Sequence, residues 1–187
     1  MNDKKHLVLQ ATLKLITERG FHDTPMSMIA REAGVAAGTI YHYFSSKEEL
    51  INELYSSLKA RMGQALAEGM QEAGNIKERY FRFWINLYQH FIDYPQEFKF
   101  LEQYANSPLV DLQVREENVR HYQPIIDFLT EGMRYGVLRE MPLMLMLNLV
   151  YGHVVSTAKL QLNGELDISD AYLQMAVQSS WDGVRIN

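Results

Sequence analysis

Residues 24–47 read TPMSMIAREAGVAAGTIYHYFSSK, and this stretch decides the fold of the N-terminal part of the chain. A helix is predicted to end at Gly34, because glycine readily adopts the left-handed conformation that such a turn requires. A short helix is predicted over residues 37–44, where Ile40 and Phe44 lie four residues apart and point to the same side. A helix, a glycine-containing turn and a second short helix form a helix-turn-helix.

The residues around this stretch favour particular helix ends. Thr24 is expected to cap the helix that ends at Gly34, with Pro25 in the first helical position, where a missing N–H is harmless. Ser46 and Glu49 are expected to form a capping box, in which each side chain accepts from the other's backbone N–H. This box would open a long helix that ends near residue 69.

Apolar residues are expected on one side of the first helix and between the two helices of the helix-turn-helix. The first helix is expected over residues 3–19, with Gly20 as its left-handed C-terminal residue. Ala30 and Ala33 are small and permit the helices to cross closely. Val8, Ala11, Leu15 and Ile16 share one side of the first helix. The residues expected to hold the other two helices together are Ile29, Ala30, Ala33, Val35 and Ile40.

The other side of the short helix carries hydrogen-bonding side chains, namely Thr39, His42 and Tyr43. A helix that reads base edges in the major groove needs such groups on its exposed side. The alternative, that they form the solvated side of an ordinary surface helix, stays open.

In these residues the chain closely resembles the TetR family of transcriptional regulators. The resemblance covers roughly the first 55 residues without a gap, whereas the rest is similar only in length and helicity. The matching residues are Gly20-Phe21, Thr24, Ile29-Ala30, Ala33-Gly34-Val35, Gly38 to Phe44 and Lys47 to Leu50.

The resemblance implies a homodimer whose two recognition helices enter successive major grooves of double-stranded DNA at a palindromic operator. It implies a DNA-binding domain over residues 1–46 and a ligand-binding and dimerisation domain over residues 47–187. Lys47 would lie on a phosphate, assisted by the N-terminal dipole of its helix. The other residues that would face DNA are Ala37, Gly38, Thr39, Tyr41, His42 and Tyr43.

The chain also departs from the family pattern. Ser27 stands where an arginine is frequent, and Ala36-Ala37 where a serine and a basic residue are frequent. Fewer phosphate contacts are therefore expected, although alanine methyl groups can meet thymine methyl groups.

The remainder of the chain is predicted to be a helical bundle, so the fold class is all-α. No segment shows the strict alternation of apolar and polar residues that strands require. Pro124 is expected to kink one of the helices. The helices are predicted near residues 76–93, 96–106, 108–135, 142–162 and 169–181.

Aromatic residues recur at helical spacing in this bundle and favour a pocket for a flat, mostly apolar effector. Filling of an ordinary hydrophobic core is the alternative for each of them. The candidate ligand-binding residues are Phe81, Trp84, Tyr88, Phe91, Tyr104, Tyr122, Met133 and Tyr151.

The last two predicted helices favour dimerisation, because small and uncharged residues permit close packing between chains. Packing within one chain is the alternative. Residues 141–158 carry no charge. Such a stretch is typical of a membrane span or of a helix that is buried in a core or a dimer, and we predict the buried helix. The candidate interface residues are Gly152, Ser156, Leu160, Tyr172, Met175 and Ser179.

Charge and composition narrow the function classes. Residues 1–47 carry a net charge of +2 and the rest −7, which weakly favours a DNA-binding head. The chain has no cysteine, so disulfides, thiolate zinc sites and cysteine nucleophiles are excluded. The histidines are dispersed and no catalytic constellation occurs, so we expect no metal, no cofactor and no enzymatic activity. No secretory signal opens the sequence, which favours the cytoplasm over a membrane or an exported location.

The sequence therefore predicts a repressor that a small, largely apolar or aromatic effector releases from DNA. Two alternatives remain. One is a helical small-molecule-binding protein or enzyme in which the helix-turn-helix is incidental, and the other is a ligand-independent regulator or an activator.

Overall fold

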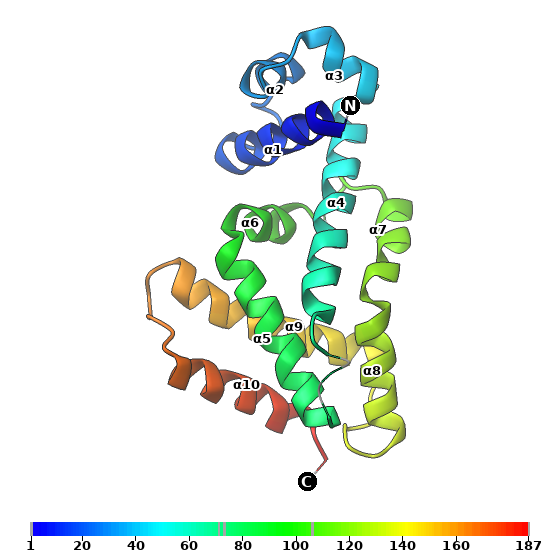
Figure 1. Cartoon of the computed structure of the whole chain (residues 1–187), viewed down its shortest axis with the longest axis vertical. Helices are drawn as coiled ribbons and strands as arrows, with labels where there is room; N and C mark the ends of the chain where they lie inside the picture. Colours follow the sequence, from blue (N-terminus) through cyan, green and yellow to red (C-terminus); the bar gives the residue numbers. More distant parts are fainter. Residues whose placement is uncertain (1, 71, 73, 106, 187) are drawn as a thin grey trace. The chain divides into compact units, whose positions relative to one another are not determined.

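The computed structural model describes residues 2–70, 72, 74–105 and 107–186, and no β-strand occurs among them (Figure 1). The prediction of an all-α fold is confirmed. The helices are α1 (Asn2–Arg19), α2 (Met26–Glu32), α3 (Ala37–Tyr43), α4 (Lys47–Ala67), α5 (Ile76–Asp93), α6 (Pro95–Tyr104), α7 (Leu112–Asn118), the 3₁₀ helix η1 (Val119–Tyr122), α8 (Gln123–Arg134), α9 (Leu143–Leu162) and α10 (Asp170–Val184).

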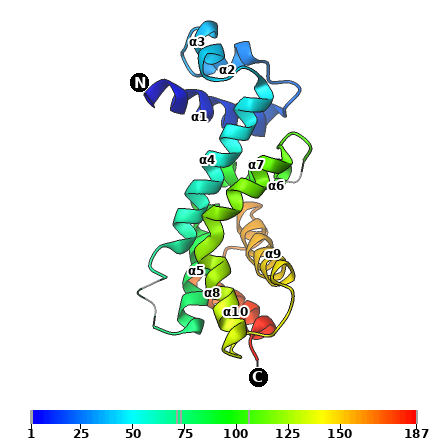
Figure 2. The ribbon, with the colours of Figure 1, turned by 90° about the vertical axis from the view of Figure 1, so that its right-hand side faces the viewer.

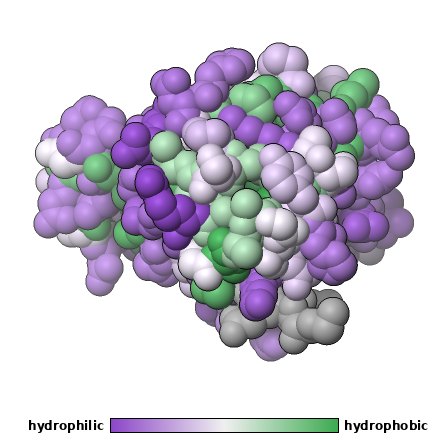
Figure 3. Space-filling model, turned by 90° about the horizontal axis from the view of Figure 1, so that it is seen from above, coloured by the Kyte–Doolittle hydropathy of each residue, from purple (hydrophilic) through white to green (hydrophobic). Residues whose placement is uncertain are grey.

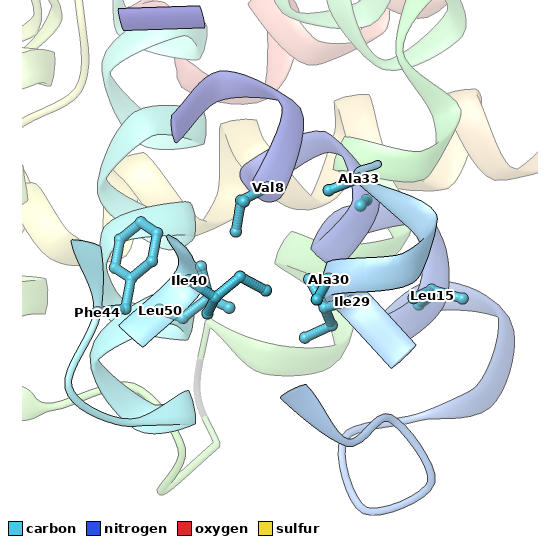
Figure 4. Close-up of a cluster of buried hydrophobic side chains, with 9 residues drawn as sticks. Val8, Leu15, Ile29, Ala30, Ala33, Ile40, Phe44 and Leu50 are labelled. Carbon is cyan, nitrogen blue, oxygen red and sulfur yellow. The ribbon is translucent and has the colours of Figure 1, made fainter. Parts of the chain in front are cut away.

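Helices α1, α2 and α3 enclose a common apolar core (Figure 4). Ile29 and Ile40 are fully buried, and Phe44 is 2% exposed, so the predicted inward side of the helix-turn-helix is correct. The α2–α3 turn contains Gly34 at φ +66°, in the left-handed region that the sequence predicts. The buried members of this core are Val8, Ala11, Leu15, Ile29, Ala30, Ala33, Ile40, Phe44 and Leu50.

The link between α1 and α2 is built differently from the prediction. Thr24 does not cap α2. Its side chain is fully buried, and its hydroxyl donates to the Gly20 carbonyl oxygen at 2.8 Å. Pro25 is the N-cap residue, without a side-chain cap, and α2 begins one residue later. Thr24 therefore fastens the end of α1, because the core draws its side chain inward and away from the start of α2.

The start of α4 has half of the predicted capping box. The Ser46 hydroxyl accepts from the Glu49 N–H at 3.1 Å, as expected. The Glu49 carboxylate, however, accepts from the N–H and the hydroxyl of Ser45, both at 2.6 Å. These two bonds lower the pKa of Glu49. The reciprocal bond is thus displaced by one residue, and helix α4 then runs without a break (Figure 2).

The chain forms two compact units that interleave in sequence. The first comprises Met1–Ala60 and Pro95–Asn118, and the second comprises Arg61–Tyr94 and Val119–Asn187. In the first unit α6 packs against α1. This grouping by contacts differs from the predicted division after residue 46, which was drawn by function and stays a prediction.

In the second unit α5 packs against α8, α9 and α10. The hydroxyls of Tyr80 on α5 and Ser180 on α10 share a buried hydrogen bond of 2.7 Å. The Tyr80 ring meets Trp181 edge-on with centroids 5.2 Å apart. Aromatic packing of this kind fixes the relative rotation of the two helices.

The predicted helix over 108–135 is wrong as a single kinked helix. The segment divides into α7, η1 and α8, and Pro124 lies in the first turn of α8. Proline clashes with a preceding turn and has no N–H to donate, so a new helix begins there. The predicted helix 96–106 is α6, which ends at Tyr104, and residue 106 lies outside the described residues.

Within the single chain, helix α9 is buried on one side only, so burial of its other side in a dimer stays a prediction. Met146, Val150 and Val154 are buried, whereas Met144 and Leu149 on the other side are 67% and 46% exposed. By length and composition α9 is apolar enough to cross a membrane, a test that core helices of soluble proteins also pass. The exposed side instead gives α9 an apolar surface.

Candidate nucleic-acid interface

Helix α3 turns one side inward and leaves the other exposed. Ala37, Gly38 and His42 are exposed, Tyr41 is 59% exposed, and Thr39 is half-buried. This orientation follows from Ile40 and Phe44, which anchor the opposite side in the core described above. The predicted DNA-facing residues of α3 are therefore placed where a ligand can reach them, and their contact with DNA stays a prediction.

Tyr43 differs from the other predicted DNA-facing residues. It is half-buried and packs against the apolar core of the helix-turn-helix. Its ring lies edge-on to His42 with centroids 5.3 Å apart. Tyr43 therefore also supports the position of His42, a structural part that helical spacing alone does not reveal.

Gly38 has no packing reason to lack a side chain. A Cβ added there would meet no heavy atom within 4 Å among the described residues, and its φ is not positive. Glycine inside a helix costs about 0.5–1 kcal/mol relative to alanine. A glycine without a local steric reason is typical of a surface to which a ligand approaches closely.

Lys47 lies against Phe21. Its ammonium donates to the Phe21 carbonyl oxygen and lies 4.0 Å from the centre of the Phe21 ring. Burial lowers the pKa of Lys47. The predicted phosphate contact would therefore require the ammonium to share or exchange this partner, which the sequence does not reveal.

Two other cations of the first unit form ion pairs. Lys5 lies 2.6 Å from the Glu53 carboxylate, and Lys14 lies 2.5 Å from the Glu32 carboxylate. The Glu32 carboxylate raises the pKa of Lys14, and Lys14 lowers that of Glu32. Exposed pairs of this kind contribute little stability, but they compete with phosphates for the same cations.

The structure brings several of the candidate effector-binding residues together within the second unit. The rings of Trp84 and Tyr88 stack with centroids 6.2 Å apart, and Phe91 meets Tyr151 edge-on at 6.1 Å. Tyr122 and Met133 belong to the same unit and are half-buried. Tyr104 belongs to the first unit.

Phe81 points away from the buried stripe and is half-exposed. It lines a surface hollow together with Lys77, Arg82 and Ile85. Lys77 lies 5.1 Å from the Phe81 ring centre. The spacing of four residues from 77 to 81 to 85 was the available signal for this hollow, which the sequence prediction missed.

Trp84 has an unusual polar atom. The residue is fully buried, and its indole N–H finds no acceptor among the described residues. A buried donor without an acceptor costs about 1–3 kcal/mol. This donor therefore lowers the stability of the packed stripe.

The predicted interface residues lie on exposed sides of α9 and α10. Gly152, Ser156 and Ser179 are exposed, and the sequence missed that Met144, Leu145 and Leu149 extend the apolar surface. The uncharged run of residues 141–158 was the signal for them. The exposed fractions of the other predicted residues are 37% for Leu160, 48% for Tyr172 and 65% for Met175.

Comparison with known proteins covers nearly the whole chain. Residues 8–54 match the family described as "Bacterial regulatory proteins, tetR family", and residues 75–185 match "Tetracyclin repressor-like, C-terminal domain". The fatty acid metabolism regulator protein of Bacillus subtilis is 30% identical over 71% of this chain and 70% of its own length.

Solved structures agree in fold. A TetR family transcription regulator from Marinobacter aquaeolei VT8 has a TM-score of 0.94 at 20% identity, covering 100% of this chain and 97% of that chain. The transcriptional regulator FadR from Bacillus subtilis, in complex with stearoyl-CoA, has a TM-score of 0.72 at 25% identity, covering 92% and 97%.

Proposed function

Because the chain belongs to the TetR family of transcriptional regulators, we propose that it is a dimeric, cytoplasmic repressor that an apolar effector releases from a palindromic operator. The observation that carries the DNA-binding part is the orientation of α3. Ile40 and Phe44 hold one side in the core, and the other side is exposed for the major groove. The proposal includes no catalytic step.

The test of DNA binding is a gel shift with the DNA upstream of the protein's own gene, beside a scrambled duplex of equal length. Lys47→Ala should weaken binding to every sequence and flatten the salt dependence, because a phosphate contact carries no sequence information. Tyr43→Ala should also weaken binding to all sequences. Thr39→Ala and His42→Ala should instead alter which operators are selected.

Two outcomes would count against this assignment. One is equal affinity for the upstream DNA and the scrambled duplex at physiological salt. The other is a binding-site selection in which the Thr39→Ala and His42→Ala variants keep the operator of the unmodified protein.

The apolar sides of α9 and α10 support a dimer with a second copy of the chain. Met144, Leu149 and Met175 expose large apolar side chains there. Gly152 lies among them, and a Cβ added to it would meet no heavy atom within 4 Å among the described residues. A helical glycine without a neighbour in its own chain suits close approach of a partner helix. Light scattering that gives a stable 21.7 kDa monomer at micromolar concentration would contradict the dimer.

The effector proposal is supported by the buried aromatic stripe of α5. Trp84 and Tyr88 are stacked and buried, so an effector would have to open this packing, and the indole N–H of Trp84 finds no acceptor among the described residues. The relative FadR carries stearoyl-CoA, whose acyl chain is long and apolar. We therefore expect a largely apolar or aromatic effector with an acceptor group, and the first compounds to test are stearoyl-CoA and a panel of aromatic molecules.

Binding has a direct readout, because an effector beside Trp84 should change its fluorescence. Trp181→Phe removes the other tryptophan and isolates the signal. A release of about tenfold in DNA affinity needs about 1.4 kcal/mol of differential effector binding, and stronger release needs up to about 3 kcal/mol. The effector proposal fails if the whole panel leaves Trp84 emission and operator binding unchanged.

A further inference from the structure

The exposed side of α3 offers no charged or amide side chain. The seven residues of the helix read AGTIYHY, and all of them are described. Guanine is read by arginine or lysine, adenine by asparagine or glutamine, and cytosine by acidic residues. None of these pairings is available from α3, so the commonest bidentate contacts to base edges are closed to it.

The start of α3 presents small, apolar side chains. Ala36 and Ala37 are exposed, and Thr39, half-buried, carries a methyl group beside its hydroxyl. The 5-methyl group of thymine is the apolar group on the major-groove edge of a base pair. An exposed methyl group that meets it removes apolar surface of both partners from water.

Gly38 places this start of α3 in a position to approach a base edge closely. With no side chain at residue 38 and nothing packed over it, the helix backbone itself can come near the floor of the groove. The first residues of a recognition helix are those that contact base edges in helix-turn-helix proteins.

Three cations of the first unit already have partners, and the exposed Arg31 belongs to α2 and not to α3. Lys14 and Lys5 are held by Glu32 and Glu53, and Lys47 by Phe21. Figure 3 shows residues of apolar and intermediate hydropathy in the centre of the face in view, with hydrophilic residues around them.

Resting on the proposed function as a DNA-binding regulator, we propose that α3 selects its operator half-sites through the 5-methyl groups of thymine, which Ala36, Ala37 and Thr39 contact. Each half-site accordingly contains A·T pairs where α3 begins, and guanine N7 acceptors are not read there.

The test begins with a selection of binding sites from random duplex DNA by the full-length protein. The thymines of the selected half-sites are then replaced one at a time by deoxyuridine, which removes only the 5-methyl group. Burial of one methyl group is worth about 0.8 kcal/mol, so each contacted thymine should cost about fourfold in affinity. Deoxyuridine outside the half-sites, and 7-deazaguanine at any guanine that faces residues 36–39, should leave the affinity unchanged.

A variant assigns the contact to a residue. Ala37→Gly removes one methyl group from the protein, and in this variant the thymine that Ala37 contacts should become equivalent to deoxyuridine. Ala171→Gly is the matched control, because it makes the same change at an exposed position in the first turn of α10. In that control the ratio of affinities for thymine and deoxyuridine should equal the ratio of the unmodified protein.

The outcomes separate the two proposals. Sequence-specific binding that is indifferent to deoxyuridine, or that 7-deazaguanine abolishes, overturns thymine readout and leaves DNA regulation intact. A selection that yields no preferred sequence overturns both. A fourfold loss confined to one or two half-site thymines, and abolished by Ala37→Gly, supports the inference.

Discussion

Thr24 illustrates how one buried hydroxyl holds a helix end. It is fully buried and donates to the carbonyl oxygen of Gly20 at 2.8 Å. Thr24→Val keeps the shape but removes the bond, so the free energy of unfolding should fall by about 1–2 kcal/mol in urea titration. Thr130→Val is the control, because its exposed hydroxyl donates to Ile126 at 2.7 Å where water can replace it. An equal loss in both variants would show that burial of the Thr24 bond is unimportant.

His90 links stability to pH. It is 5% exposed, and burial first, then the positive charge of Arg61, lowers its pKa to about 4. The unfolded chain takes up this proton near pH 6.5, whereas the folded chain does so only near pH 4. The unfolding free energy should therefore be unaffected by His90 above about pH 6.5 and should fall between pH 6.5 and 4 by about 2–3 kcal/mol.

The measurement is urea unfolding at several pH values between 4 and 8. His90→Gln should flatten the acid limb of the stability curve, whereas His6→Gln, at an exposed position, should not. A His90→Gln protein that loses stability with acid as steeply as the unmodified protein would assign the effect to other groups.

For single residues, the sequence predicts whether a side chain points inward or outward better than it predicts the hydrogen-bond partner of that side chain. The inward positions of Ile40 and Phe44 follow from helical period, and so does the exposed position of His42. The partners of Thr24 and Lys47 do not follow from it, because a hydroxyl or an ammonium can donate to any nearby carbonyl oxygen. Only the assembled core decides which carbonyl lies within reach.

The middle of α4 is fixed by a close backbone contact. A Cβ added to Gly63 would clash with the carbonyl oxygen of His121 and would lie 2.9 Å from its Cβ. Because the obstacle is backbone of the 3₁₀ helix η1, it cannot rotate aside. Gly63→Ala should therefore lower the free energy of unfolding by about 1–3 kcal/mol, measured by thermal and urea unfolding.

Gly38→Ala is the matched control for this change. It lies in open space with negative φ, so alanine should raise stability by about 0.4–1 kcal/mol while it weakens DNA binding if the backbone approaches the groove there. Stabilisation by both changes would indicate that helix propensity, rather than the contact with His121, controls the result.

Most helices could be predicted because apolar spacing and glycine mark their extents. The predicted 76–93 is the observed α5, and α10 begins one residue after the predicted start. The break between α7 and α8 was missed because apolar residues keep helical spacing across it. Pro124 fits a first turn as well as a kink, and the sequence does not distinguish the two.

For the whole molecule, the exposed apolar side of α9 predicts that two copies of the chain form a dimer. Leu149→Glu places a carboxylate on that side, and burial of an unpaired charge costs several kcal/mol. We expect the variant to sediment as a monomer where the unmodified protein is a dimer. Leu112→Glu is the control, because Leu112 on α7 is 68% exposed and Leu149 is 46% exposed. The Leu112→Glu variant should stay dimeric. Dimers in both variants would place the interface elsewhere.

The grouping of the helices into two units could not be predicted from the sequence. The contact of α6 with α1 joins residues more than 75 positions apart, and local spacing carries no information about such pairs. The candidate sites divide in the same way. Their residues and faces could be named in advance, whereas the orphaned indole N–H of Trp84 depends on what packs around it.

The interleaving of the two units limits how such regulators can exchange parts. The chain crosses from one unit to the other after residues 60, 94 and 118, so no single cut separates them. A chimera joined near residue 46 would graft α1 onto a foreign α6 and would have to restore their packing at once. Recombination between relatives should therefore succeed more often when the donor supplies residues 95–118 together with the N-terminal segment. Helices α6 and α7 then have to be exchanged together with the DNA-binding helices.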